Sequence, residues 1–331
     1  MAMVRAVGLK PIVRGLIVAV AVTVSGCATP TASTAPTPRI GTASDLASIS
    51  PPPSASAAVA AASPTAQSTA TPYPMPTGAP LTWITPSPSV TCTEDTANGK
   101  LLYQSGARSY SGNMFRPAGS GPFPAMLVLH TSAGLGEHEL AYGRWLADQG
   151  YVALAPDYFT PVSVTRQSFD PNTLQADAVR EDLARAIDCL RSLAYVDKAR
   201  VGAVGFSLGG YFALALGTRA DVRAVIGYYA GVCKPADDLC PARYPTATVA
   251  AQMRAPVLLL HGDADTTVPF AFIRATQDIL MGAGKISQLV PYAGVQHAFD
   301  FGSRASNPGY DARATADAQA RSLAFLQATV R

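Results

Sequence analysis

One serine of this chain lies in a pattern that could make it a nucleophile. Gly205, Ser207 and Gly209 form the sequence G-x-S-x-G, between an apolar segment at 201–206 and a helical run at 208–216. This is the context of a nucleophile elbow, a strand-to-helix turn so tight that only glycine fits beside the serine. Because a serine hydroxyl is a poor nucleophile until a base removes its proton, a histidine and an acid should follow in the sequence.

The chain has four histidines, and one of them stands where the base is expected. His297 follows the last predicted strand and precedes the predicted terminal helix, so we predict that it is the general base. His130 and His261 come at strand ends, and we expect them to order loops as hydrogen-bond donors. His138 lies in a polar stretch at 136–139 and is expected to be solvated.

Two aspartates are candidates for the acid that orients this histidine. Asp263 and Asp265 lie in the sequence HGDADTTVP at 261–269, directly after the apolar run at 257–260. Both therefore come at the carboxyl end of a predicted strand, and position alone leaves either open.

Hydrolysis of an acyl bond also needs hydrogen-bond donors for the developing oxyanion. The backbone N–H of Leu208, the residue after the serine, is the first expected donor. The second is expected from the loop at 130–135, with Ser132 as the candidate, although this loop lacks the HGGG sequence of many lipases. All these elements lie just past the carboxyl ends of strands, where ligands bind in open α/β sheets.

Six short segments that contain no Lys, Arg, Asp or Glu are the predicted strands. They are Ala125–His130, Tyr151–Ala155, Val201–Phe206, Ala224–Tyr229, Val257–His261 and Ile286–Tyr292. Continuous apolar runs of this length are typical of parallel strands covered on both faces. Helical patterns lie between them, which predicts a doubly wound, mostly parallel α/β sheet.

The clearest helical pattern is at 176–193. Its apolar face consists of Val179, Leu183, Ile187 and Leu190. The charged residues lie off this face, and Glu181 and Arg185 have the spacing of a stabilising pair.

The N-terminus has the features of an export signal. Three basic residues precede an apolar run at 15–24 that is too short for a bilayer, which needs about 20 apolar residues. The sequence VSGC at 24–27 resembles a bacterial lipobox. We expect 1–26 to be a signal peptide, and Cys27 to be lipidated and to anchor the mature protein to the membrane outside the cytoplasm.

The next segment has a composition that cannot form a core. Residues 28–90 hold 13 of the 27 prolines and only two charged residues. Such a segment buries too little apolar surface to offset its ordering entropy. We predict that 27–90 is a lipidated, disordered tether and that 91–331 is a single catalytic domain.

The charge balance argues against nucleic acid as a principal partner. Three of the 25 basic residues lie in the signal segment, which leaves 22 against 22 acidic residues in the mature chain. A chain near neutrality has no overall field for phosphate, although a local patch could escape this count.

Four cysteines remain in the mature domain, where export would let disulfides persist. Cys233 and Cys240 flank a short loop that contains Pro and Asp, and we predict that they pair, with two free thiols as the alternative. The spacing lacks the C-x-x-C pairs of structural zinc sites, so no metal is expected. The serine chemistry requires no organic cofactor.

Residues 100–331 resemble the dienelactone hydrolase family. The similar stretches are PAMLVLH at 124–130, LADQGY at 146–151, APDY at 155–158, VGFSLGG at 204–210, H-G-x-x-D at 261–265, Tyr292 through HAF at 297–299, and NPGYD at 307–311. The resemblance implies the α/β-hydrolase fold. It also implies that the acid is the aspartate that ends H-G-x-x-D, namely Asp265.

Departures from the founding members of this family bear on the substrate. Ser207 stands where they have cysteine, and the position near Thr131 lacks the glutamate that helps to control that thiol. Pro161 and Phe301 stand where two arginines hold the substrate carboxylate. The resemblance and these departures together predict a small neutral carboxylic ester as the substrate.

The expected reaction is two-step acyl transfer through an acyl-enzyme. The aromatic residues expected to line the substrate pocket, each of which could instead be a core residue, are Tyr158, Phe159, Tyr229 and Phe301. A peptidase or polyester hydrolase could use the same three residues. A non-catalytic surface lipoprotein could keep the fold only to bind a partner, but it would have no reason to retain all three.

Overall fold

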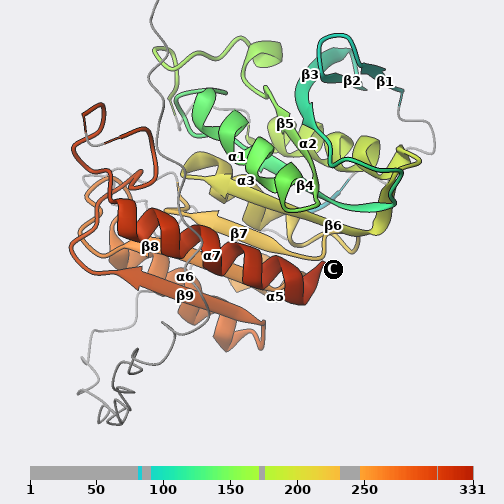
Figure 1. The fold of residues 1–331 in the computed structure, drawn as a ribbon. Helices are drawn as coiled ribbons and strands as arrows, with labels where there is room; N and C mark the ends of the chain where they lie inside the picture. Colours follow the sequence, from blue (N-terminus) through green and yellow to red (C-terminus); the bar gives the residue numbers. More distant parts are fainter. Residues whose placement is uncertain (1–80, 84–90, 171–175, 232–246, 304, 331) are drawn as a thin grey trace, which may run out of the picture. The chain divides into compact units, whose positions relative to one another are not determined.

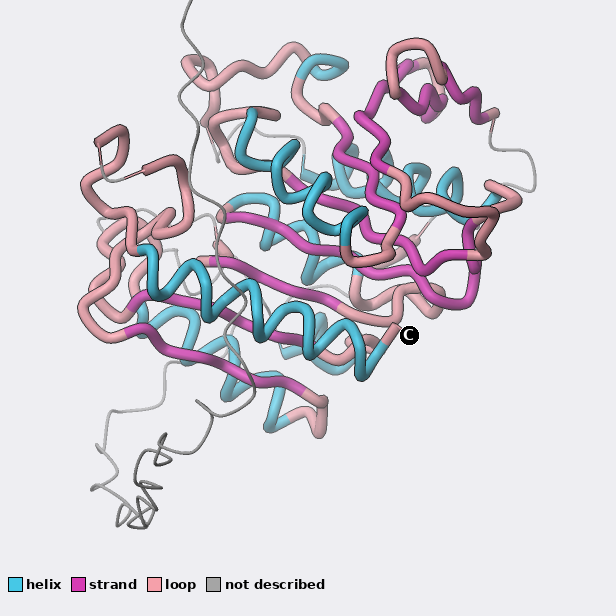
Figure 2. The backbone as a smooth tube through the Cα atoms, in the orientation of Figure 1, coloured by secondary structure: helices cyan, strands magenta, loops and turns pink. Residues whose placement is uncertain are grey.

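The computed structural model describes residues 81–83, 91–170, 176–231, 247–303 and 305–330. They form one nine-stranded sheet in the order β1-β2-β3-β5-β4-β6-β7-β8-β9, with helices on both faces (Figures 1 and 2). The strands are β1 Cys92–Asp95, β2 Lys100–Ser105, β3 Arg108–Phe115, β4 Phe123–Leu129, β5 Val152–Pro156, β6 Val196–Phe206, β7 Val225–Tyr228, β8 Val257–Gly262 and β9 Ser287–Tyr292.

Six neighbouring strands of the sheet are parallel, which confirms the predicted sheet. They are β5, β4, β6, β7, β8 and β9. They coincide with the six apolar segments of the sequence. Strands β1, β2 and β3 extend the sheet with antiparallel pairs, and β3 joins it at β5. In β2, buried and exposed residues alternate, so no continuous apolar run marks this part of the sheet.

Helices cover both faces of the sheet (Figure 1). They are α1 Glu137–Asp148, α2 Ala176–Ser192, α3 Leu208–Leu216, α5 Ala247–Gln252, α6 Phe270–Gly282 and α7 Ala312–Thr329, with a short 3-10 helix at Thr160–Val162. Alternate residues of β4 enter separate cores. Leu127 and Leu129 pack with α2, α3 and α6, whereas Met126 and Val128 pack with α1 and α7. This alternation is what makes each parallel strand apolar throughout.

Helix α2 buries the four apolar residues predicted for its inner face. The predicted pair of Glu181 with Arg185 is wrong, because Arg185 binds Asp188 at 2.9 Å instead. Asp182 is fully buried and accepts hydrogen bonds from Arg108, at 2.7 Å, and from the Tyr110 hydroxyl. The antiparallel edge of the sheet therefore covers part of the polar side of α2, and the buried carboxylate is paired there.

A disulfide joins Cys92 in β1 to Cys189 in α2, with a Cα–Cα distance of 5.7 Å. It ties the antiparallel edge of the sheet to the helix that covers it. Cys233 and Cys240, which the sequence predicted to pair, both lie outside the described residues.

The chain contacts this domain before residue 91. Gln252 forms two hydrogen bonds with the backbone of Leu81, and the Trp83 indole donates to Thr218 at 2.9 Å. Residues 81–83 therefore pack on the domain, which corrects the prediction that they belong to the disordered tether at 27–90. Within the described ranges, every helix is too short or too polar to cross a membrane.

The disulfide should contribute measurably to stability. The bridged residues are 97 positions apart, and closing such a long loop restricts the unfolded chain, so replacing both cysteines with alanine should lower the free energy of unfolding by about 3 kcal/mol. Urea unfolding of the oxidised parent and the Cys92→Ala/Cys189→Ala variant measures this difference. The reduced parent should match the variant, and a difference below about 1 kcal/mol would contradict the assignment.

Candidate active site

Ser207 occupies a strained turn between β6 and α3. Its backbone has φ 52° and ψ −114°, a conformation that is costly for any residue with a side chain. A Cβ atom on Gly205 would lie 2.0 Å from the carbonyl oxygen of Gly209, and one on Gly209 would lie 2.2 Å from that of Leu129. Both glycines of the motif are therefore required for α3 to begin this close to the strands.

The structure brings Ser207, His297 and Asp265 into one hydrogen-bonded row. The His297 Nε2 atom is 3.0 Å from the Ser207 Oγ atom, and its Nδ1 atom is 2.7 Å from the Asp265 Oδ2 atom. A neutral imidazole that donates its Nδ1 proton to the carboxylate has a free lone pair on Nε2 for the serine proton. The Asp265 side chain is fully buried, whereas that of His297 is 18% exposed. Of these two groups, only the imidazole is in contact with solvent.

Asp265 is held as a carboxylate by several donors. Its Oδ1 atom accepts hydrogen bonds from the backbone N–H groups of Thr267 and Val268, both at 2.8 Å. The His261 Nε2 atom lies 3.2 Å from its Oδ2 atom. Burial alone would raise the pKa of Asp265, but its bonds to His261, His297 and Val268 hold it well below the usual value. The group is therefore ionised at neutral pH.

The other candidate acid and two other histidines have different partners. The exposed Asp263 accepts the backbone N–H of Gly294 at 2.6 Å, so it holds the turn before His297. His130 and His261 form hydrogen bonds with the carbonyl oxygens of Thr131 and Val268, as expected of loop-ordering residues. Burial lowers the pKa of His130 to about 4, so this ring is neutral.

The prediction that His138 is solvated is wrong. Its side chain is only 9% exposed, with its Nε2 atom 3.2 Å from Asp300 and its Nδ1 atom 3.7 Å from Glu139. The ring of Phe301 stacks on it at 4.5 Å. Burial would lower its pKa, but the interactions with Asp300 and Glu139 raise the pKa of His138 to about 9. This imidazolium is therefore a buried cation between two acids.

This cluster is connected to the hydrogen-bonded row through Tyr229. The Tyr229 hydroxyl donates to Asp300 at 2.8 Å, and its ring lies edge-on to that of His297 at 4.7 Å. Asp300 and His138 thereby hold the Tyr229 ring in place beside the His297 imidazole. Sequence reasoning missed the roles of His138 and Asp300, and the only signal was that Asp300 comes three residues after His297.

The predicted oxyanion donors come from the two expected elements. Leu208 begins α3, and Ser132 lies in the loop after β4. Neither backbone N–H has a hydrogen-bond acceptor in the described part of the chain. The loop is ordered by Thr131, whose Oγ1 atom accepts the N–H of Ala133 at 3.0 Å and whose carbonyl accepts that of Gly134 at 3.1 Å. The positive end of the α3 dipole also favours an anion beside Leu208.

The four predicted pocket aromatics divide into two groups. Tyr158 is fully buried and stacks on His130 at 3.6 Å, and Phe159 meets the same ring edge-on at 4.8 Å. These two support the loop that carries Ser132. Tyr229 meets the His297 ring edge-on, and the half-buried Phe301 stacks on His138. Among the described residues, no group of three or more His, Cys, Asp or Glu side chains could hold a metal ion.

The fold and the hydrogen-bonded row define an α/β hydrolase. A sequence model of the dienelactone hydrolase family matches residues 111–330, and the chain belongs to that family. A carboxymethylenebutenolidase of Pseudomonas putida is 28% identical over 237 residues, which are 66% of this chain and 93% of the relative.

Solved structures agree with this fold. The dienelactone hydrolase-like promiscuous phosphotriesterase P91 from metagenomic libraries is 26% identical with a TM-score of 0.57, covering 72% of this chain and 98% of its own. The dienelactone hydrolase from Anabaena variabilis is 21% identical with a TM-score of 0.53, covering 70% and 100%. The protein is accordingly an enzyme, a hydrolase of the dienelactone hydrolase type.

The buried cation predicts an unusual histidine titration. In a histidine NMR titration of the parent protein, the His138 ring should titrate near pH 9 instead of about 6.5. Because the folded pKa is raised, protonated His138 contributes its full stability below about pH 6.5, and this contribution is lost as the pH rises through about 9. The Asp300→Asn variant, which removes one acid, should shift the midpoint downward. A midpoint at or below 6.5 in the parent would contradict the assignment.

Proposed function

We propose that the protein hydrolyses carboxylic esters with Ser207 as nucleophile, His297 as general base and Asp265 as the acid that orients the base. The observation that carries the proposal is the pair of hydrogen bonds, 2.7 Å and 3.0 Å long, that links the three side chains. Side chains in this arrangement activate a hydroxyl on several unrelated folds, so geometry is a better guide here than sequence position.

The reaction proceeds in two steps. His297 removes the Ser207 proton through Nε2 as Oγ attacks the ester carbonyl, and Asp265 stabilises the resulting imidazolium. The N–H groups of Leu208 and Ser132 donate to the oxyanion. Collapse of this tetrahedral oxyanion expels the alcohol, which takes the proton from Nε2. The product of this step is an acyl-enzyme on Ser207. His297 then deprotonates a water that attacks the acyl carbon, and Ser207 leaves with the proton.

The charges around the site favour an ester without a free carboxylate. Pro161 and Phe301 carry no positive charge that could bind one. The buried cluster beside Tyr229 holds one cation, His138, with the two acids Asp300 and Glu139. A substrate carboxylate near this cluster would meet a net negative charge in a medium that screens it poorly.

We further propose that the enzyme works outside the cytoplasm, attached to the membrane by lipid on Cys27 after removal of residues 1–26. The export signal and the lipobox-like sequence support this location. The disulfide between Cys92 and Cys189 gives independent support, because such bonds persist mainly in oxidising compartments.

Two aspartates in one loop offer a matched test of the catalytic assignment. Asp265→Asn should lower kcat/KM by about 10³-fold or more, since the amide cannot stabilise the imidazolium, and Ser207→Ala should also abolish labelling by a fluorophosphonate probe. Asp263→Asn, which alters only the turn near Gly294, should remain within a few-fold of the parent. Equal losses in both aspartate variants, or a labelled Ser207→Ala variant, would overturn the proposal.

A substrate panel tests the ester class. Pairs of esters that differ only in a free carboxylate on the acyl group should be hydrolysed with kcat/KM at least about tenfold higher for the neutral member, a difference of about 1.4 kcal/mol. Matched amides and a polyester in the same assay examine the peptidase and polymer alternatives, and the neutral esters should be the better substrates. A preference for the charged esters would contradict the assignment.

A further inference from the structure

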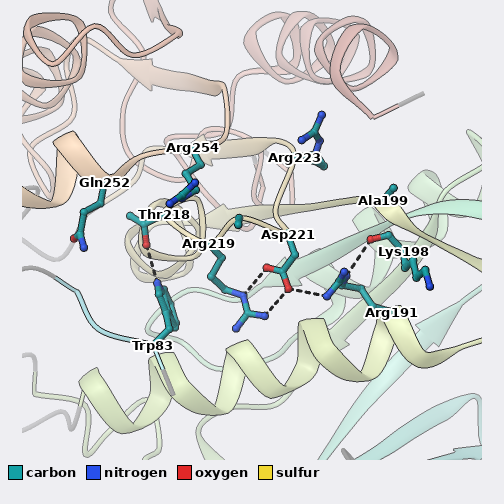
Figure 3. A pocket seen from close by; sticks show the side chains of 11 residues that line it. Trp83, Arg191, Lys198, Ala199, Thr218, Arg219, Asp221, Arg223, Gln252 and Arg254 are labelled. Atoms are coloured by element: carbon teal, nitrogen blue, oxygen red, sulfur yellow. Dashed lines mark hydrogen bonds and ion pairs between the residues drawn. The ribbon is translucent and has the colours of Figure 1, made fainter. Parts of the chain in front are cut away.

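A cavity of about 860 Å³ lies at the edge of the sheet opposite to Ser207. Figure 3 shows the side chains that line it. It is lined by the beginning of β6, by residues just after α3, and by the residues that precede β7 and β8. The residues of the candidate active site follow the carboxyl ends of these parallel strands, whereas the cavity lies at their amino ends. The cavity is therefore a separate feature of the molecule.

The lining of this cavity is strongly basic. The basic residues are Arg191, Lys198, Arg219, Arg223 and Arg254, and Asp221 is the one acidic residue among the lining residues. Asp221 binds Arg219 at 2.7 Å and Arg191 at 2.8 Å. Arg219 also binds the buried Asp188 at 2.7 Å. Two of the five basic residues, Arg191 and Arg219, thus already have acidic partners.

The other three positive charges lack such partners among the described residues. Lys198, Arg223 and Arg254 are exposed, and their side chains form no hydrogen bond or ion pair with the rest of the described chain. Figure 3 shows Arg223 and Arg254 apart from the bonded group around Asp221. This is a local basic patch that the balanced charge of residues 27–331 conceals.

Helix dipoles do not explain this charge. Helices α2, α3 and α5 end near the cavity, and each helix end carries at most about −0.5 of a charge, or about −1.5 together. The lining residues carry five positive charges against one negative charge. The excess is larger than the helix ends can balance, so it remains available for an anion.

One wall of the cavity is an ordered aromatic ring. The Trp83 indole donates to the Thr218 hydroxyl at 2.9 Å, and the guanidinium groups of Arg180 and Arg219 lie 5.2 and 5.6 Å from its ring centroid. The hydrogen bonds between Leu81 and Gln252 hold the segment that carries it. The cavity therefore combines an apolar face with cations that have no partner in the described ranges, and its volume suits a small ligand or a polar headgroup.

We propose that this cavity binds a phosphate-bearing ligand, with the phosphate on the exposed cations of the lining, Arg223, Arg254 and Lys198, and the attached group against Trp83. Isolated exposed ion pairs contribute little, so a singly charged carboxylate would gain little here. A phosphate offers several acceptor oxygens to several cations at once, and arginine binds such groups with paired hydrogen bonds. The phosphate could belong to a phospholipid headgroup or to a soluble compound.

Binding measurements on the proposed mature chain, residues 27–331, separate these two sources. The Cys27→Ser background of this chain lacks both the proposed lipid and the basic, apolar segment at 1–26, so that attachment to vesicles reports the rest of the protein. Calorimetry with inorganic pyrophosphate probes a soluble phosphate. Sedimentation with phosphatidylcholine vesicles, with and without phosphatidylglycerol, probes a headgroup. We expect binding to pyrophosphate or to the anionic vesicles, weakened about tenfold in the Arg223→Gln/Arg254→Gln variant.

A matched control distinguishes a site from general charge. The Arg274→Gln/Arg313→Gln variant also removes two exposed positive charges, but from outside the cavity, and should bind like the Cys27→Ser background. Ester hydrolysis should be unchanged in both variants, so failure of the proposed catalytic function would leave this test intact. Absence of binding to both probes, or equal weakening in the two variants, would overturn the proposal.

Discussion

The hydrogen bond between the Asp265 carboxylate and the His297 imidazole is the interaction on which the site depends. It fixes the imidazole tautomer that leaves Nε2 free to accept the Ser207 proton. A buried carboxylate costs several kcal/mol unless it is hydrogen-bonded. The backbone N–H groups of Thr267 and Val268 and the side chain of His261 provide these bonds. The loop after β8 is therefore arranged around the Asp265 carboxylate.

A second constraint is backbone strain next to the same residues. Ser207, Tyr229 and Ala298 all have positive φ angles, of 52°, 37° and 55°. Each such conformation costs about 1 to 3 kcal/mol and persists only where surrounding structure enforces it. The enforcing bonds are visible at all three positions: Ser207 N–H donates to Tyr228, Tyr229 N–H to Leu260, and the Asn307 amide donates to the carbonyl of Ala298. Strands β7 and β8 thus hold the strained backbone at Ser207 and Tyr229, and the Asn307 side chain holds that at Ala298.

The sequence was informative wherever a short segment determines its own environment. The apolar runs predicted the six parallel strands because each such strand is covered on both faces, and the glycine spacing around Ser207 predicted the turn that only glycine permits. The antiparallel strands β1 to β3 were missed because half-exposed strands carry no continuous apolar run. Strand order was also inaccessible, since it depends on which distant segments pair.

The failures at the level of single residues have the same cause. His138 has polar neighbours in sequence, and only the fold brings Asp300 and Phe301 to it. The partner of Cys92 is 97 positions away in α2, so spacing along the chain could not identify it. The basic cavity collects arginines from α2, from the turn after α3 and from the approaches to β7 and β8, whereas a charge count averages them with acids elsewhere.

The most direct measurement of the central claim is a crystal structure of the protein after reaction with a phosphonate ester inhibitor. Such an adduct mimics the tetrahedral intermediate of acyl transfer. The account predicts a covalent bond from phosphorus to the Ser207 Oγ atom, with the phosphonyl oxygen within hydrogen-bond distance of the N–H groups of Leu208 and Ser132 and the His297 Nε2 atom beside Oγ. An adduct on another residue, or a phosphonyl oxygen directed away from both N–H groups, would contradict it.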